Sequence, residues 1–126
     1  MNQLVEHFID SSIADALDQH SYRERFENKG SELSGFCNEV ALAVARRFLN
    51  GAISFEDADA VANDFYALYI GDATVTELPE PADAIYLAFD RGEYSMGDED
   101  PVEEHTRPML RAILSSYSSR GSPGND

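Results

Sequence analysis

The sequence lacks several features that would assign a class at once. It has no tryptophan, and its one cysteine, Cys37, has no second cysteine with which to form a disulfide. No apolar run approaches the roughly 20 residues that span a bilayer, and the first residues carry neither a basic flank nor an apolar stretch. We therefore expect no signal peptide, a reducing cytoplasmic compartment, and a buried, unreactive Cys37.

Motifs of known chemistry are missing too. The sequence has no glycine-rich phosphate loop, no nucleophile elbow and no Cys–His pairing. Its three histidines have no second histidine or cysteine at metal-ligand spacing. The acidic run at residues 98–100 resembles a calcium loop in charge alone, and only a loose calcium contact stays open there. We expect no enzyme activity, no cofactor and no bound metal.

Basic residues are scarce, and their scarcity is regional. The chain has 24 Asp and Glu against nine Lys and Arg, a formal net charge of −15. Residues 51–105 hold fifteen acids and one base, Arg91, whereas residues 1–50 hold eight acids and five bases. Nucleic acid and anionic membranes carry the same sign and are poor partners, but a basic protein would be attracted. Acidity that serves solubility alone is the alternative.

The apolar pattern is clearest over residues 31–71, where it predicts two antiparallel helices joined by a tight turn. Gly51 ends the first helix in a left-handed conformation, and Ser54 caps the second. Apolar residues recur at steps of three and four on one face of each helix: Leu33, Phe36, Cys37, Val40, Ala41, Val44 and Phe48, then Phe55, Ala58, Val61, Ala62, Phe65, Leu68 and Tyr69. Asp64 lies mid-helix among apolar neighbours, and we interpret Asn63–Asp64 as a polar pair that fixes this hairpin.

Three further helices are predicted around the hairpin. They cover residues 2–20, residues 82–91 after Pro81, and residues 101–118, where Asp100 is the cap and Pro108 kinks or restarts the helix. The inner face of the last helix is predicted to consist of Val102, His105, Met109, Leu110, Ile113, Leu114 and Tyr117. The fold class is therefore all-α, a single-domain bundle of about five helices around a central antiparallel hairpin. The domain covers residues 1–118, and the Ser/Gly/Pro-rich residues 119–126 are predicted to be a disordered tail.

Aromatic residues within the acidic region indicate a binding surface. Tyr66 lies off the apolar stripe of its helix, and Tyr94 lies in a predicted loop, so neither is needed for a core. Tyrosines beside carboxylates are typical of a surface that binds a basic protein. We predict solvent-exposed acids with tyrosine anchors at ten partner-binding positions: Asp57, Asp59, Tyr66, Glu77, Glu80, Asp83, Tyr86, Asp90, Glu93 and Tyr94.

Residues 45–58 read ARRFLNGAISFEDA. This joint resembles that of small acidic bacterial immunity proteins of the colicin-immunity kind, in which a helix ends in Phe-x-x-Gly-x-Ile-Ser and an acidic helix follows. The resemblance implies a helical, cytoplasmic protein that blocks a basic, nuclease-type toxin by occlusion. It carries over no toxin-contacting residue, and residues 78–96 have no counterpart in that pattern. The alternatives are a helical adaptor or structural protein of unknown partner and an acidic mimic of nucleic acid.

Overall fold

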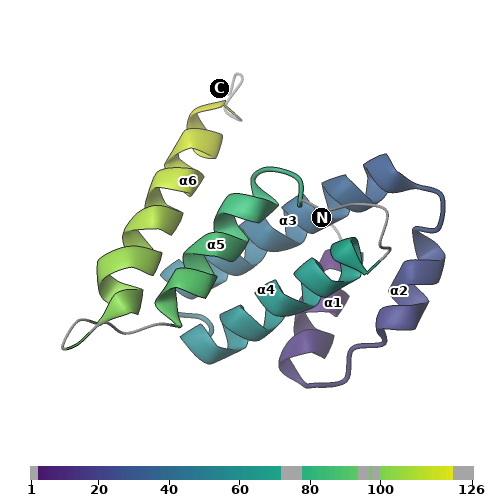
Figure 1. Ribbon diagram of the computed structural model, residues 1–126, viewed down its shortest axis with the longest axis horizontal. Coiled ribbons are helices and arrows are strands. Elements are labelled where there is room, and N and C mark those ends of the chain that lie inside the picture. The colour runs from purple at the N-terminus through teal and green to yellow at the C-terminus, as the bar shows by residue number, and fades with distance from the viewer. Residues whose placement is uncertain (1–2, 72–77, 94–96, 98–99, 121–126) are drawn as a thin grey trace.

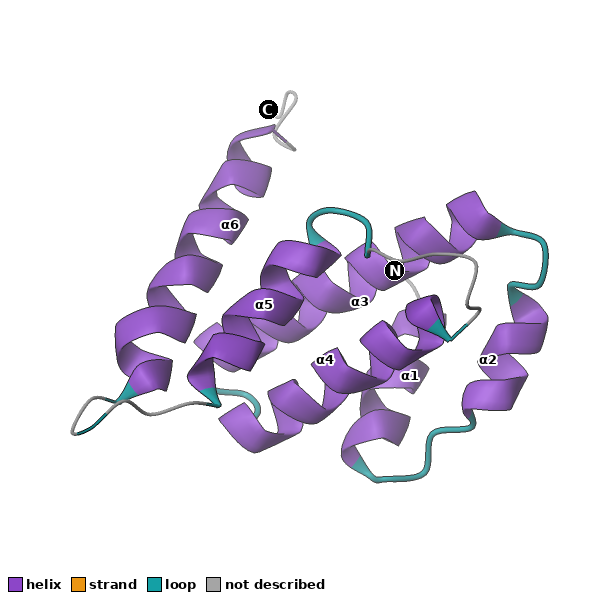
Figure 2. Ribbon diagram, viewed as in Figure 1, coloured by secondary structure: helices purple, strands orange, loops and turns teal. Residues whose placement is uncertain are grey.

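The computed structural model describes residues 3–71, 78–93, 97 and 100–120 (Figure 1). Within these residues the chain forms helices and no strand, which confirms the all-α prediction (Figure 2). The elements are α1 (Gln3–Ile13), α2 (Gln19–Arg25), α3 (Gly30–Leu49), α4 (Phe55–Ile70), α5 (Ala82–Gly92), the π-helical turn η1 (Val102–Thr106) and α6 (Arg107–Arg120).

The central hairpin of α3 and α4 forms as predicted. Gly51 is left-handed at φ 79°, where a side chain would be strained. Ser54 Oγ accepts a hydrogen bond from the backbone N–H of Asp57 at 3.1 Å, which satisfies one of the free donors of α4. The two helices stay in contact along their length, since Phe48 and Phe55 meet near the turn and the hydroxyls of Ser34 and Tyr69 lie 3.0 Å apart near the far end.

Helix α5 packs on both arms of the hairpin, and Figure 1 shows it beside α4 with α3 behind. Its first N–H, from Ala82, donates to Asn38 Oδ1 of α3 at 3.0 Å, so a residue of another helix caps it. Near its other end, the Phe89 ring contacts the Phe48 ring at 5.6 Å between centroids. These two contacts hold one side of α5 against α3. Another side of α5 lies against α4.

The predicted first helix is split in two, so the bundle has one α-helix more than expected among the described residues. Helix α1 ends at Ile13, and Asp15 adopts a left-handed φ of 58°. Asp18 then caps α2 by accepting from the N–H of Ser21 at 3.1 Å. The break lets Tyr22 turn inward, where its ring contacts Phe8 at 5.1 Å. The packing of Tyr22 on Phe8, together with the turn residues Asp15 and Asp18, therefore outweighs the periodicity that predicts one continuous helix.

The last helix differs from its prediction near its start. The N–H of Glu103 donates to Asp100 Oδ1 at 3.4 Å, which confirms the cap, but the next residues form a π-helical turn before α6 restarts near Pro108. Leu110 is buried as predicted, and Ile113 and Leu114 pack against the core, but Met109 is 38% exposed and Thr106, which the prediction left out, is buried. Helix α6 continues to Arg120, two residues beyond the predicted domain end, and residues 121–126 of the predicted tail lie outside the described residues.

Candidate partner-binding surface

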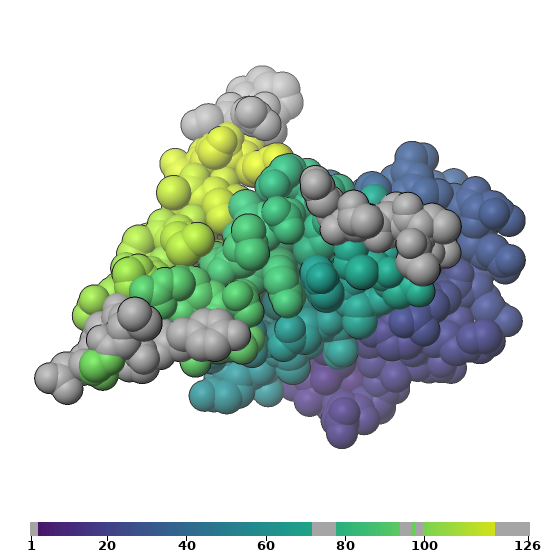
Figure 3. Space-filling view, in the orientation of Figure 1, coloured from purple at the N-terminus to yellow at the C-terminus, as the bar shows by residue number. Residues whose placement is uncertain are grey.

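Two rows of side chains meet where α4 and α5 lie side by side. The helices run antiparallel, because Tyr66 of α4 meets Tyr86 of α5 while Asp59 meets Glu93 just past the end of α5. We call this group the acidic tyrosine surface, and its members are Glu56, Asp59, Tyr66, Tyr86, Asp90 and Glu93. Figure 3 views the molecule from the side on which α4, in teal, and α5, in green, form one continuous face.

The two tyrosines form a stacked pair at the surface. The ring centroids of Tyr66 and Tyr86 lie 4.5 Å apart with 14° between the ring planes. Tyr66 is 37% exposed, so part of the stack is open to solvent. Burial, followed by the nearby Asp90, Tyr66, Glu93 and Asp59, raises the pKa of Tyr86. Tyr86 is therefore a neutral hydroxyl at physiological pH, and the pair offers a flat apolar area with polar ends.

The carboxyl groups of Asp59, on α4, and Glu93, just past the end of α5, lie close enough to interact. Burial raises the pKa of Asp59 to about 7, with further contributions from hydrogen bonding to Glu93 and from the negative charges of Glu93, Asp90 and Glu56. The carboxyls of Glu56, Asp90 and Glu93 thus each raise the pKa of Asp59, where the first half of α4 meets the end of α5.

The structure brings five of the ten predicted partner-binding residues together: Asp59, Tyr66, Tyr86, Asp90 and Glu93. The reason is helical spacing, because steps of three and four place residues of one helix on one face.

The other predicted positions do not join this group. Asp57 is two residues from Asp59 and therefore lies on a different side of α4. Glu80 is in the turn before α5, and Asp83 is in the first turn of α5, at the end away from Glu93. Glu77 and Tyr94 lie outside the described residues.

The expectation that all the acids are solvent-exposed is wrong for part of the set. Glu80 and Glu93 are exposed, whereas four others are half-buried: Asp57, Asp59, Asp83 and Asp90. Close packing of α4 on α5 covers the inner sides of Asp59 and Asp90, which a reading of one helix at a time does not show.

Sequence reasoning missed Glu56 at this face and the exposure of Leu87 on α5. Glu56 acts on Asp59, and its position three residues before Asp59 on the same helix was the available signal. Leu87, next to Tyr86 in the chain, is 49% exposed, an unusual position for a large apolar side chain. It lies off the apolar stripe of α5, and that departure was visible in the sequence.

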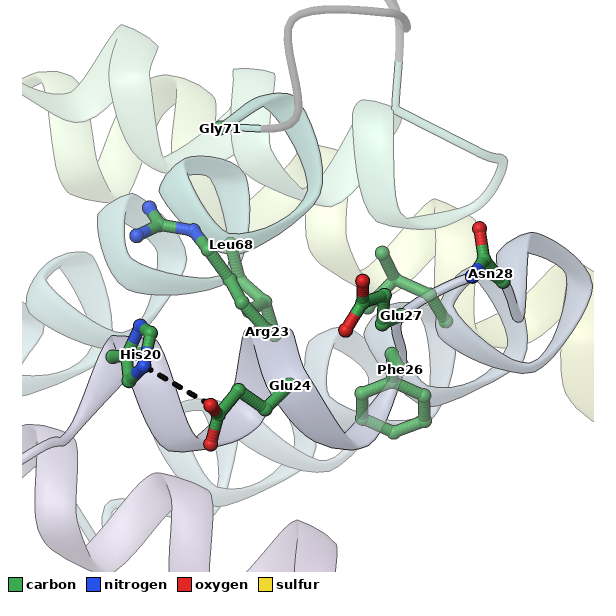
Figure 4. Close-up of a pocket in the computed structure, with 9 residues that line it drawn as sticks. His20, Arg23, Glu24, Phe26, Glu27, Asn28, Leu68 and Gly71 are labelled. Atoms are coloured by element: carbon green, nitrogen blue, oxygen red, sulfur yellow. Dashed lines mark ion pairs between the residues drawn. The ribbon is translucent and has the colours of Figure 1, made fainter.

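The main pocket lies elsewhere, between α2 and the end of α4 (Figure 4). It has a volume of about 440 Å³ and contains none of the predicted partner-binding residues. His20 and Glu24 pair across one turn of α2 at 3.2 Å, the helix face that their spacing predicts. Arg23 reaches toward the end of α4, where its Nη2 lies 3.5 Å from the carbonyl of Ala67. Three of the charged or titratable side chains here thus have partners within the protein: His20 and Glu24 pair with each other, and Arg23 contacts the end of α4.

The two other residues singled out in the sequence have structural roles. Cys37 is fully buried, as predicted, and burial raises its thiol pKa to about 12, so it stays an unreactive thiol. Asp64 does not fix the α3–α4 hairpin. Its carboxylate accepts from the Ser12 hydroxyl, and its backbone carbonyl accepts from Gln19 Nε2 at 3.0 Å. Asp64 therefore ties the start of the chain to α4.

Among the described residues, no three or more His, Cys, Asp or Glu side chains are grouped so that they could hold a metal ion. In the same part of the chain, every helix is too short or too polar to cross a membrane. Comparison of the sequence with protein-family models and curated proteins, and of the structure with solved structures, found no match. The resemblance to immunity proteins therefore stays a prediction.

Proposed function

We propose that this chain is a non-enzymatic binding protein that docks a basic protein partner on the acidic tyrosine surface. The observation that carries the proposal is the half-exposed Tyr66–Tyr86 stack with Asp59, Asp90 and Glu93 beside it. Tyrosines are frequent anchors in interfaces, and a surrounding field of one sign raises the rate at which an oppositely charged partner associates.

A basic toxin is the first candidate for that partner. The immunity-like joint at residues 45–58 supports this choice, and an immunity protein would act by covering a cationic active site. The compact grouping of acids around two tyrosines also favours docking over mimicry of nucleic acid, since a mimic presents carboxylates spread along one face at the spacing of phosphates. The adaptor alternative predicts that the acids of residues 51–105 can be neutralised without loss of binding.

The experiment is to immobilise the protein, recover partners from the source organism at low salt, and measure association rates at two salt concentrations. We expect a basic partner whose association rate falls by about tenfold or more with added salt. Recovery of acidic or neutral proteins only, or a rate that salt does not change, would reject the proposal.

Two variants localise the contact, each with a matched control. Tyr66→Ala should weaken binding by about 2 kcal/mol or more, whereas Met109→Ala, a side chain of similar exposure on α6, should not. Asp90→Asn should lower the association rate more than Asp15→Asn, an exposed acid between α1 and α2. If the recovered partner is a nuclease, stoichiometric addition of this protein should stop its cleavage; continued cleavage by a saturated complex would exclude the immunity role.

A further inference from the structure

The pocket between α2 and the end of α4 has an apolar floor. Leu68 of α4 is 1% exposed, and Phe26 and Leu33 are half-buried. The Phe26 ring packs on the Phe36 ring at 5.0 Å between centroids, so the core holds its position. The volume of about 440 Å³ lies within the range of small-molecule sites, which in helical proteins occur between helices.

Arg23 forms one side of this pocket and approaches the end of α4 closely. Its Nη2 lies 3.5 Å from the carbonyl of Ala67, and a Cβ atom added at Gly71 would lie 2.6 Å from the same nitrogen. Glycine at position 71 therefore leaves room for the guanidinium across the end of the helix. A guanidinium has five N–H donors in a planar fork, and the contact with Ala67 uses one of them.

Glu27 supplies a negative charge on another side of the pocket (Figure 4). It is four residues from Arg23, a spacing at which helical side chains can pair. Helix α2 ends at Arg25, however, and the ion pairs of the described residues do not join Arg23 to Glu27. Glu24, the other acid of the lining, pairs with His20 at 3.2 Å. The pocket thus presents an exposed cation and an exposed anion, not paired with each other, around its apolar floor.

We propose that this pocket binds a small zwitterion with an apolar side chain, of the amino-acid class. The ligand carboxylate accepts from the remaining N–H groups of the Arg23 fork, its ammonium donates to Glu27, and its side chain covers the apolar floor. Charge separates this class from its alternatives. The net charge of −15 repels a plain anion and Arg23 repels a plain cation, whereas a zwitterion has no net charge.

The site shares no residue with the acidic tyrosine surface and does not depend on the proposed docking. The first test titrates the full chain with three ligands that carry the same branched apolar group, near neutral pH. They are L-leucine, 4-methylpentanoate, which lacks the ammonium, and 3-methylbutylamine, which lacks the carboxylate.

Amide NMR follows each titration. Leucine should shift the amides of pocket residues such as Asn28 and Gly71. It should bind about tenfold or more tightly than either relative, because each relative lacks one charged contact. Absence of a shift at the pocket amides, or equal binding of leucine and one of its relatives, would overturn the proposal.

The second test removes the two charges of the pocket one at a time. Arg23→Gln and Glu27→Gln should each weaken leucine binding by about tenfold, whereas Arg25→Gln, an exposed base of α2 outside the pocket lining, should not.

The two variants should also differ in selectivity, which a general loss of folding does not produce. Arg23→Gln should lose the preference for leucine over 3-methylbutylamine, and Glu27→Gln should lose the preference over 4-methylpentanoate. Amide spectra show whether each variant is folded. Glu27 is exposed and lies past the end of α2, so its variant stays informative if Arg23→Gln loosens that helix. Unchanged affinity and selectivity in folded Glu27→Gln would overturn the assignment of a zwitterion.

Discussion

Two groups of aromatic rings in this molecule differ in burial and in the charges around them. At the α1–α3 end, Phe8, Tyr22 and Phe36 are all 5% exposed or less, with Phe8 edge-on to the other two rings at 5.1 and 5.6 Å. At the α4–α5 face, Tyr66 and Tyr86 stack with Tyr66 37% exposed. The first group is what a core requires. The second leaves apolar area in water, which stability alone does not explain.

The charges near these two groups differ in the same way. Beside the buried group, Arg47 lies 3.7 Å from Asp10 and also pairs with Glu6, and the Tyr22 hydroxyl lies 2.8 Å from His7 Nδ1. Beside the exposed stack, the groups that act on Asp59 are all acids. Like charges held close together destabilise a fold. The comparison therefore separates a region built for stability from one that has a cost in the free protein, and the second is where a partner is expected.

The largest effect should come from the buried group. Phe8→Ala should lower the free energy of unfolding by about 3–5 kcal/mol, because the ring is fully buried and its loss leaves a cavity beside Tyr22 and Phe36. Urea titration measures this loss. Leu87→Ala is the control for a large side chain on the exposed face and should cost well under 1 kcal/mol. A loss below about 1 kcal/mol for Phe8→Ala would mean that the α1 end is not part of the cooperative core.

The next effect is a pH dependence located at the exposed face. An unfolded aspartate loses its proton near pH 4, but folded Asp59 keeps its proton until about pH 7. The native state thus binds more protons than the unfolded state between these values, so this group's contribution to stability falls as pH rises from about 4 to about 7.

Asp59→Asn should remove that pH-dependent contribution to stability, because asparagine does not titrate. It should stabilise the protein by about 1–2 kcal/mol at pH 8, a value discounted for partial exposure, and change little at pH 4.5. Urea titrations at both pH values measure this difference, with Asp15→Asn as the control for the loss of one negative charge. Equal gains for the two variants at pH 8 would assign the effect to net charge and not to the α4–α5 pair.

Much of the fold could be predicted from the sequence because its strongest signals are local. The stop at Gly51 and the cap at Ser54 depend on residues within one turn of each other, and both are confirmed. The break after Ile13 and the burial of Thr106 depend on distant partners: Tyr22 must reach Phe8, and Thr106 must reach Ala88 of α5. Periodicity along one helix does not contain that information.

The candidate surface was predictable in composition and only partly in geometry. Spacing within each helix relates Asp59 to Tyr66 and Tyr86 to Asp90, but the antiparallel pairing that joins these rows is set by the packing of α5 on the hairpin. For the same reason, the half-burial of Asp59 and its raised pKa could not be predicted from residue type.

A smaller effect concerns helix caps, which occur in both regions and should not distinguish them. Ser54→Ala removes the acceptor for the Asp57 N–H, and Asp18→Ala removes the acceptor for the Ser21 N–H. Each should cost about 1 kcal/mol by urea titration, the usual value of an N-cap. A much larger loss for Ser54→Ala would show that the acidic first turn of α4 depends on its cap more than α2 does. The α4–α5 face would then differ from the α1–α3 end in helix capping as well as in burial and charge.

The smallest expected effect on stability is at the exposed stack itself. Tyr66→Ala should change the free energy of unfolding by only about 0.5 kcal/mol, because the ring is partly in water and its main contact is the stack with Tyr86. The measurement is urea titration beside Phe8→Ala under the same conditions. A loss comparable to that of Phe8→Ala would make Tyr66 a structural residue and remove the contrast on which the docking proposal depends. A small loss in stability together with a large loss in affinity for a recovered basic partner is the combination that an interface anchor produces and that a core residue does not.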